Sequence, residues 1–296
     1  MDRILRGLDG NKAIRLVAAI TTDVVREGVR RHGVSSSAAI LLGRGLTAGC
    51  LLTTLTKGDD ERVRIAMKGD GPLGRMLVDA RGQGTVRGCF TTERVSQMNL
   101  PAQPGRGAVG SYVGAGQLQI TRDLGLENTY QGIVELTSGE LDEDLEHYLT
   151  TSEQLPSVLR CQVSLDSDGQ VLRAAGVLAQ TFPGSDPSLL DPVRRAVADE
   201  GLADVLRQER SVEDLMGFAL QGGEYHASES APLSFACECG PERARAVVST
   251  LGADDIDALA TEQGSTDVRC SYCGDAYTLD EAALRALAQD LRTQRS

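Results

Sequence analysis

Four cysteines near the C-terminus, arranged as two close pairs, constrain this chain more than any other feature. The pairs read Cys237-Glu-Cys239 and Cys270-Ser-Tyr-Cys273, with thirty residues between them. Two thiolates from each of two turns are the ligand set of one tetrahedral Zn²⁺. Metal binding then supplies folding free energy to a small module, and this paired spacing is not typical of unrelated buried or disulfide-bonded cysteines. The sequence therefore predicts one zinc per chain, bound by Cys237, Cys239, Cys270 and Cys273.

Charge and composition argue against several kinds of partner. The 296 residues carry a net charge of −12, and only 3% are aromatic, with no Trp. An acidic chain is a poor partner for nucleic acid or for an anionic membrane. No apolar run approaches the roughly 20 residues that span a bilayer, and the N-terminus lacks an apolar signal segment. Clustered cysteines without such a signal are typical of a reducing compartment, so we expect a cytoplasmic protein without nucleic-acid or membrane partners.

The first part of the chain, residues 1–182, is expected to be an α+β domain with a mostly antiparallel sheet. Gly69-Asp-Gly-Pro72 separates two strand-like segments, and Asp166-Ser-Asp-Gly169 separates two more. Both tetrapeptides are typical of hairpin turns. A long apolar helix is predicted between Ser35 and Gly58. Hairpin-connected strands mixed with helices indicate the α+β class.

Residues 183–232 are expected to form a helical linker of low stability. The pattern from Asp186 onward is helical but weakly apolar, and it is interrupted by Pro192, Gly201 and Gly217. Isolated helices of this length are marginal in water, so docking on neighbours must supply their order. We therefore expect modest burial here and the lowest stability in the chain.

The remaining residues, 233–296, form the predicted zinc module. Pro241 suits the first position of a helix, because the missing N–H group costs nothing there. Thr278-Leu-Asp-Glu281 matches a capping box, which predicts Thr278 as the cap of the last helix and Glu281 as the side chain that reaches back.

The other reactive residue types do not form a catalytic site. No motif ties any of the three His residues to a Ser or Cys nucleophile, so we do not expect an enzyme. Cys50, Cys89 and Cys161 lie within apolar helix or strand patterns. We interpret these three cysteines as small buried hydrophobic residues that a switch does not need.

Together with the cysteine pairs, motifs along the chain resemble those of the redox-regulated 33 kDa heat-shock chaperonins, a bacterial holdase family. The resemblance extends from about Arg6 to Asp280. Two departures occur: Gly240-Pro241 follows the first cysteine pair where the family usually has Ser, and Ala175-Gly176 replaces a doubled Gly. The matching segments are Leu42-Gly-Arg44, Gly69-Asp-Gly-Pro-Leu-Gly74, Val86-Arg-Gly88, Tyr148 with Ser152-Glu-Gln154, Ala175-Gly176 with Gln180, and the two cysteine pairs.

The resemblance implies an ATP-independent chaperone that is zinc-bound and inactive when reduced. Oxidation would form the disulfides Cys237–Cys239 and Cys270–Cys273, release zinc and unfold the module and the linker. The implied partners are unfolded client proteins, with a homodimer as an option after oxidation. The apolar linker residues then become available to clients: Leu189, Leu190, Val193, Leu202, Val205, Leu206, Leu215, Met216 and Phe218.

Two alternatives stay open from the residues alone. A zinc-ribbon regulatory or nucleic-acid-binding protein also uses paired cysteines, but the interval from Glu242 to Val268 is acidic where basic and aromatic residues are expected. A thiol oxidoreductase would use Cys270 and Cys273 as its active pair. Its usual context is a helix N-terminus that lowers the thiol pKa, whereas the residues after Cys273 read as a continuing hairpin.

Overall fold

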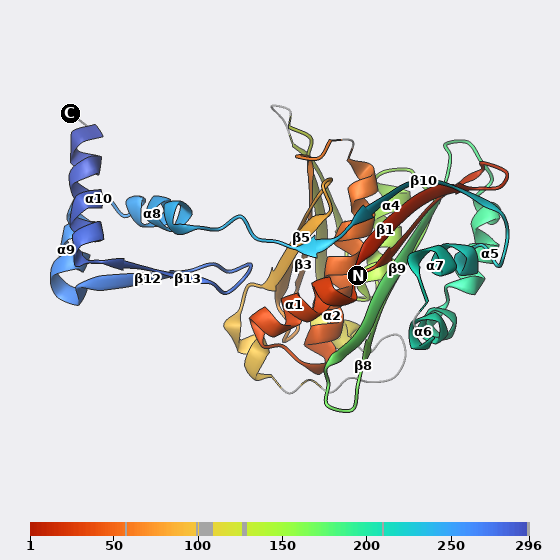
Figure 1. Cartoon of the computed structure of the whole chain (residues 1–296), viewed down its shortest axis with the longest axis horizontal. Helices are drawn as coiled ribbons and strands as arrows, with labels where there is room; N and C mark the ends of the chain where they lie inside the picture. Colours follow the sequence, from red (N-terminus) through yellow and green to blue (C-terminus); the bar gives the residue numbers. More distant parts are fainter. Residues whose placement is uncertain (57, 99, 101–108, 126–128, 209, 295–296) are drawn as a thin grey trace. The chain divides into compact units, whose positions relative to one another are not determined.

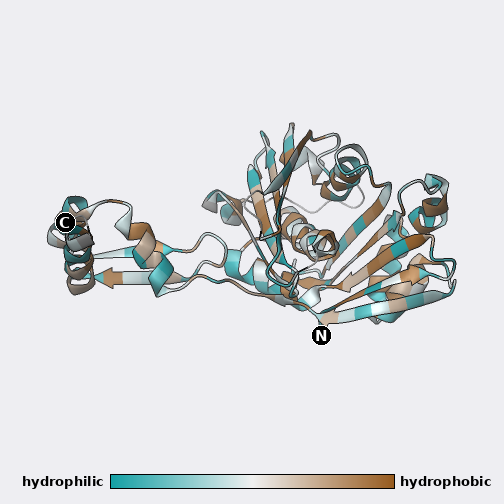
Figure 2. Cartoon of the chain, turned by 90° about the horizontal axis from the view of Figure 1, so that it is seen from above, coloured by the Kyte–Doolittle hydropathy of each residue, from teal (hydrophilic) through white to brown (hydrophobic). Residues whose placement is uncertain are grey.

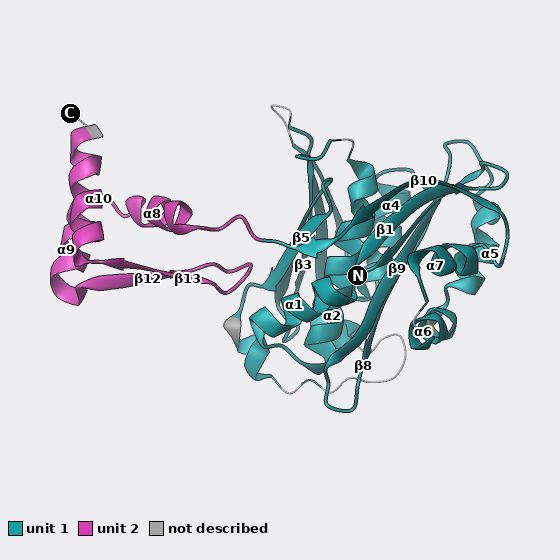
Figure 3. Ribbon diagram, viewed as in Figure 1, with its two compact units in different colours: residues 1–236 teal, residues 237–296 magenta. Residues whose placement is uncertain are grey.

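The computed structural model divides the chain into two compact units, Met1–Ala236 and Cys237–Ser296 (Figure 3). It describes all residues except 57, 99, 101–108, 126–128, 209 and 295–296. The boundary between the units falls directly before the first cysteine of the predicted zinc module. The linker helices belong to unit 1.

Within the described residues, five antiparallel strands form the first sheet of unit 1, in the order β10-β1-β2-β9-β8 (Figure 1). The hairpin predicted at Asp166-Ser-Asp-Gly169 joins β8 to β9, and the Asp166 carboxylate accepts the N–H groups of Asp168 and Gln170. The edge strand β10 and its neighbour β1 were not predicted. The strands are β1 (Arg3–Asp9), β2 (Ile14–Ile20), β8 (Ser157–Leu165), β9 (Val171–Thr181) and β10 (Tyr225–Pro232).

The second sheet built from the described residues has six strands in the order β11-β5-β4-β3-β6-β7. Its pairings are antiparallel except for the short parallel pairing of β11 with β5. The two sheets with intervening helices confirm the predicted α+β class. The strands are β3 (Arg62–Gly69), β4 (Arg75–Arg81), β5 (Thr85–Phe90), β6 (Gly116–Asp123), β7 (Tyr130–Glu135) and β11 (Ser234–Phe235).

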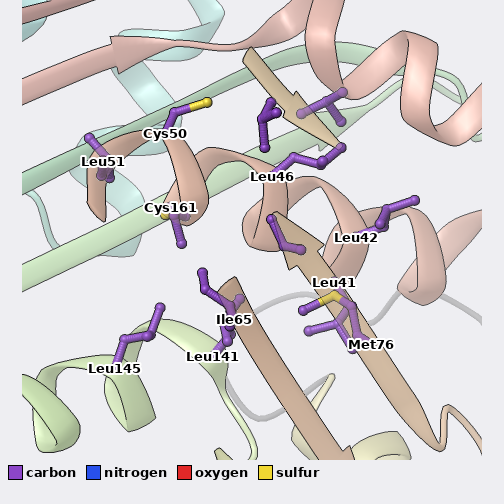
Figure 4. Close-up of a cluster of buried hydrophobic side chains, with 14 of the residues drawn as sticks. Leu41, Leu42, Leu46, Cys50, Leu51, Ile65, Met76, Leu141, Leu145 and Cys161 are labelled. Carbon is purple, nitrogen blue, oxygen red and sulfur yellow. The ribbon is translucent and has the colours of Figure 1, made fainter. Parts of the chain in front are cut away.

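The helix α2 (Ser36–Leu52) lies between the two sheets and forms the centre of the main core (Figure 4). Small residues let it approach both sheets: a Cβ atom at Gly43 would lie 2.8 Å from Val163 of β8, and one at Gly45 would lie 2.8 Å from Met76 of β4. Figure 2 shows apolar residues on the elements that meet in this interior. The remaining short elements and helices around the main core are α1 (Thr22–His32), η1 (Thr53–Leu55), η2 (Glu93–Gln97), α3 (Gly110–Val113) and α4 (Leu141–Thr151).

One helical stretch, Ser36–Leu55, is long and apolar enough to cross a bilayer by length and composition. The expectation that no apolar run approaches this length was therefore wrong. Within the protein, 83% of the apolar window is buried, because α2 packs between the two sheets. Burial of this kind is typical of a core helix.

The linker helices cover the other face of the first sheet and are more buried than predicted. They form a second core with the sheet, in which Leu215 and Met216 are fully buried. Gly201 and Gly217 lie inside helices and do not interrupt them, and residues 225–232 form β10 where a helical linker was expected. The elements are η3 (Pro187–Leu190), α5 (Asp191–Ala196), α6 (Asp199–Arg207) and α7 (Val212–Ala219).

Unit 2 is a small domain with its own core around Ile256 and Leu284. The helix at Pro241 forms as predicted, with proline in its first turn. The capping-box prediction was wrong: Thr278 lies in a strand and donates to Asp267, whereas the Asp280 carboxylate accepts the N–H of Ala283. The elements are α8 (Pro241–Ser249), α9 (Ala253–Gln263), β12 (Ser265–Arg269), β13 (Ala276–Asp280) and α10 (Glu281–Gln294).

Candidate metal centre

The second cysteine pair occupies the turn of the hairpin formed by β12 and β13. The turn is closed by two backbone hydrogen bonds, from Gly274 N–H to the Cys270 carbonyl (2.8 Å) and from Cys270 N–H to the Asp275 carbonyl (2.9 Å). Gly274 has a φ of 77°, a left-handed conformation that glycine adopts without steric cost. This tight turn holds both sulfurs on one side of the hairpin end.

The first cysteine pair lies in the extended segment between β11 and α8, and it brings its sulfurs to the same place. Cys237 Sγ lies 3.6 Å from Cys270 Sγ, and Cys239 Sγ lies 3.2 Å from Cys273 Sγ. All four sulfurs lie within 4.8 Å of one another. The structure thus brings together the four predicted ligands, all of them in unit 2.

The geometry and chemistry of this cluster fit a metal ion. Zn–S bonds of about 2.3 Å in a tetrahedron place sulfurs about 3.8 Å apart, close to the separations observed. None of the four cysteines forms a disulfide. Burial raises the pKa of the Cys270 and Cys273 thiols, so these thiols stay protonated at neutral pH unless a cation stabilises the thiolates. The cluster can therefore hold one soft divalent cation.

A tyrosine that the sequence reasoning missed completes the surroundings of the cluster. The Tyr277 hydroxyl lies 3.0 Å from Cys239 Sγ. The alternation of side chains along a strand could have predicted that Tyr277 points inward, because Tyr277 and Leu279 alternate with the exposed residues of β13. Contact with a sulfur from another segment was not predictable, since it depends on how that segment folds back.

The three remaining cysteines lie in unit 1 and are buried, as interpreted from the sequence. Cys50 of α2 and Cys161 of β8 belong to the main core, and Cys89 lies on β5 with no exposed surface. Burial raises the pKa of Cys50 to about 12 and also raises that of Cys161. Thiols with such pKa values form little thiolate at neutral pH and react slowly with oxidants.

The nine apolar linker residues do not form an open surface in this structure. Leu189 is 40% exposed and Phe218 is partly buried against the second core. The other seven are fully or almost fully buried against the first sheet: Leu190, Val193, Leu202, Val205, Leu206, Leu215 and Met216. A role of these seven buried residues in binding another protein requires the linker to leave the sheet.

Comparison with known proteins gives matches over nearly the whole chain. A family model described as Hsp33 protein matches residues 2–280. The 33 kDa chaperonin of Desulforamulus reducens is 36% identical over 288 residues, which is 97% of this chain and 97% of that protein. The 33 kDa chaperonin of Thermus thermophilus is 36% identical over 304 residues, covering 99% of this chain and 88% of that protein.

A solved structure agrees with these matches. The 33 kDa chaperonin (heat shock protein 33 homolog) of Thermotoga maritima superposes with a TM-score of 0.85 at 27% identity, covering 97% of this chain and 98% of that one. The similar proteins are thus chaperones, and the matches include both units. The chain belongs to the Hsp33 family, which is not an enzyme class, and the predicted family resemblance is confirmed.

Proposed function

We propose that the protein is a redox-regulated, ATP-independent holdase of the cytoplasm, inactive while its four-cysteine cluster is reduced and zinc-bound. The observation that carries the proposal is the convergence of four reduced sulfurs within 4.8 Å in one small unit. Bound Zn²⁺ would hold these sulfurs as thiolates and supply folding free energy to unit 2. The ligands are Cys237, Cys239, Cys270 and Cys273.

Oxidation by a peroxide is the proposed trigger. One thiolate attacks the O–O bond, which gives a sulfenic acid and hydroxide; a second thiol then displaces water from that sulfenic acid and forms a disulfide. Two such reactions consume two peroxides and remove all four ligands. The proposed disulfides are Cys237–Cys239 and Cys270–Cys273. In the reduced cluster, however, the short sulfur–sulfur contacts are those of Cys237 with Cys270 and of Cys239 with Cys273. Peptide mapping of the oxidised protein distinguishes the two pairings.

Unfolding of the module is proposed to spread into residues 183–232. Without ligands for its metal, a unit of about sixty residues loses on the order of 10 kcal/mol of folding free energy. The segment that joins it to the linker has only a short strand pairing, because β11 ends at Phe235, two residues before Cys237, and pairs with β5 through two residues. Leu233 is buried in the main core and Phe235 packs against that core, so these two side chains also hold the segment. Once the linker leaves the first sheet, its nine apolar residues can bind unfolded clients, and the freed surface can also support a homodimer.

The test is zinc stoichiometry, far-UV circular dichroism and suppression of aggregation, measured on the same samples before and after peroxide. We expect one zinc per reduced chain, loss of zinc and helical signal after peroxide, and suppression of aggregation that disappears after reduction with added zinc. Cys270→Ser should fail to retain zinc, whereas the buried Cys161→Ala should retain it as a matched control. Full zinc retention by the Cys270→Ser variant contradicts the ligand assignment.

Two other results would redirect the proposal. Catalytic turnover of a disulfide substrate would favour a thiol oxidoreductase, although Cys270 and Cys273 lie in a hairpin turn and not at a helix N-terminus. A rise in chaperone activity while the linker stays as protected from hydrogen exchange as in the reduced form would instead favour a preformed client surface.

A further inference from the structure

Tyr277 connects the sulfur cluster to the core of unit 2. It lies on β13 opposite Val268 of β12, and its ring packs on the apolar cluster that contains Ile256 and Leu284. Its hydroxyl reaches Cys239 Sγ at 3.0 Å. A metal-bound thiolate has no proton to donate, so in the loaded cluster the hydroxyl is the donor. The hydrogen bond is therefore charge-assisted and among the stronger contacts of its kind.

The hydrogen-bond donors to the second cysteine pair have a different origin. Cys270 Sγ accepts backbone N–H groups from Tyr272 and Cys273, and Cys273 Sγ accepts that of Asp275. These donors belong to the turn itself, so no side-chain substitution removes them without reshaping the hairpin. The hydrogen bond from Tyr277 to Cys239 comes from a side chain, so a single substitution at Tyr277 can remove it and leave the backbone unchanged.

We infer that Tyr277 is a positioning residue that slows oxidation of Cys239 and so sets the peroxide sensitivity of the switch. The inference rests on the proposed metal-thiolate function. A hydrogen bond to a thiolate withdraws charge from the sulfur lone pairs, and a less nucleophilic sulfur attacks the O–O bond of a peroxide more slowly. Removing the hydroxyl should therefore raise the rate of the first step, in which the Cys239 thiolate becomes a sulfenic acid and hydroxide leaves.

The same contact links oxidation to unfolding. When the Cys239 sulfur enters a disulfide it loses its negative charge, and a neutral sulfur is a weak acceptor. The Tyr277 hydroxyl then loses its charged partner while the ring remains anchored in the core. Oxidation at the cluster thus weakens one of the contacts that fix β13 against the segment of the first cysteine pair.

The test compares Tyr277→Phe with the wild type and with Thr278→Val. The Phe variant keeps the ring and deletes only the hydroxyl. The Val variant deletes the neighbouring hydroxyl, which bonds Asp267 at 2.6 Å on the opposite face of the same hairpin, and so controls for hairpin stability. Removing a side chain that hydrogen-bonds a metal ligand typically changes metal affinity or activity by about 10- to 100-fold. We expect peroxide to oxidise the zinc-loaded Tyr277→Phe variant roughly tenfold faster, with Cys239 trapped first as sulfenic acid, and Thr278→Val to match the wild type.

A spectroscopic measurement gives a second readout that does not depend on chaperone activity. In the Co²⁺-substituted protein, loss of the hydrogen bond should move the sulfur-to-cobalt charge-transfer band to lower energy in Tyr277→Phe and leave it unchanged in Thr278→Val. Equal oxidation rates and equal bands in Tyr277→Phe and wild type, at equal metal stoichiometry, overturn the inference while leaving the proposed switch intact. A wild-type protein that binds neither metal overturns the proposed function instead. If Tyr277→Phe does not bind metal, incorporation of 3-fluorotyrosine, a stronger donor, into the wild type should slow oxidation, and an unchanged or faster rate refutes the inference.

Discussion

Replacing Leu215 by Ala should loosen the linker without oxidation. Leu215 has no exposed surface and lies in α7, which packs on β1 and β2 of the first sheet. The substitution removes three carbon atoms, each worth about 0.8 kcal/mol when buried, and leaves a cavity in addition. The docked state therefore loses about 3 kcal/mol of stability. Since each 1.4 kcal/mol is a factor of ten, the equilibrium constant for docking of the linker falls by roughly 150-fold.

The assay is hydrogen exchange of the reduced, metal-loaded protein, read by mass spectrometry. Amides of α5 to α7 should exchange about a hundredfold faster in Leu215→Ala, whereas amides of β3 to β5 should keep their wild-type protection. Aggregation of an unfolded test protein should be partly suppressed in the same sample without peroxide. Leu189→Ala is the matched control, because Leu189 is a linker leucine with 40% exposure and should cost about 1 kcal/mol or less.

Two outcomes refute this reasoning. If β3 to β5 lose protection to the same extent as α5 to α7, the linker and the main core unfold as one unit and the linker is not a separate element. If the linker keeps its protection although the variant is globally destabilised, the second core does not hold the helices on the sheet.

Two further predictions concern unit 1. Replacing Cys50, Cys89 and Cys161 together by Ala should leave peroxide-triggered zinc release at the wild-type rate and lower only thermal stability, because these buried thiols do not form reactive thiolates; a variant that folds but no longer responds to peroxide contradicts this. Arg194→Ala removes an ion pair of 2.7 Å between α5 and Glu146 of α4 and a hydrogen bond of 3.3 Å to the Ser157 carbonyl. Because Arg194 is 44% exposed, hydrogen exchange of α5 should rise only about two- to threefold at low salt, and by less at 1 M salt, where the ion pair is screened.

Local patterns predicted the hairpins and the core helix well. The residues between β3 and β4 and between β8 and β9 favour turn conformations through their own local chemistry, independently of the rest of the chain. The two cysteine pairs likewise predict a shared metal site, because this spacing is typical of the ligands of one metal ion. In both cases the signal lies within a few neighbouring residues.

Interactions between distant segments were harder to predict. The sequence Tyr225–Pro232 is mostly polar, and it becomes a strand because β1, more than 200 residues earlier, offers a free edge. The linker helices appeared weakly apolar because their few apolar residues all point to one side, toward a sheet face that the linker sequence does not contain. Tyr277 similarly acquires its role only when Cys239 folds back onto it.

The order of elements along the chain suggests how the proposed metal centre would control a buried surface. The linker helices are tethered at one end by β9 and at the other by β10, an edge strand that, among the described strands, pairs with β1 alone and has mostly exposed side chains. Such a strand is held by backbone hydrogen bonds and by exposed side-chain contacts, among them the ion pair between Arg6 and Glu229. It gains little from the hydrophobic effect, so we expect it to be weakly retained once the chain beyond it is disordered. Freeing one end of the linker also removes the entropic advantage of a closed loop. In the proposed switch the metal centre would need no direct contact with the linker, because a folded unit 2 that anchors the chain at Cys237 would help to keep β11 and β10 in place and thereby favour the docked state.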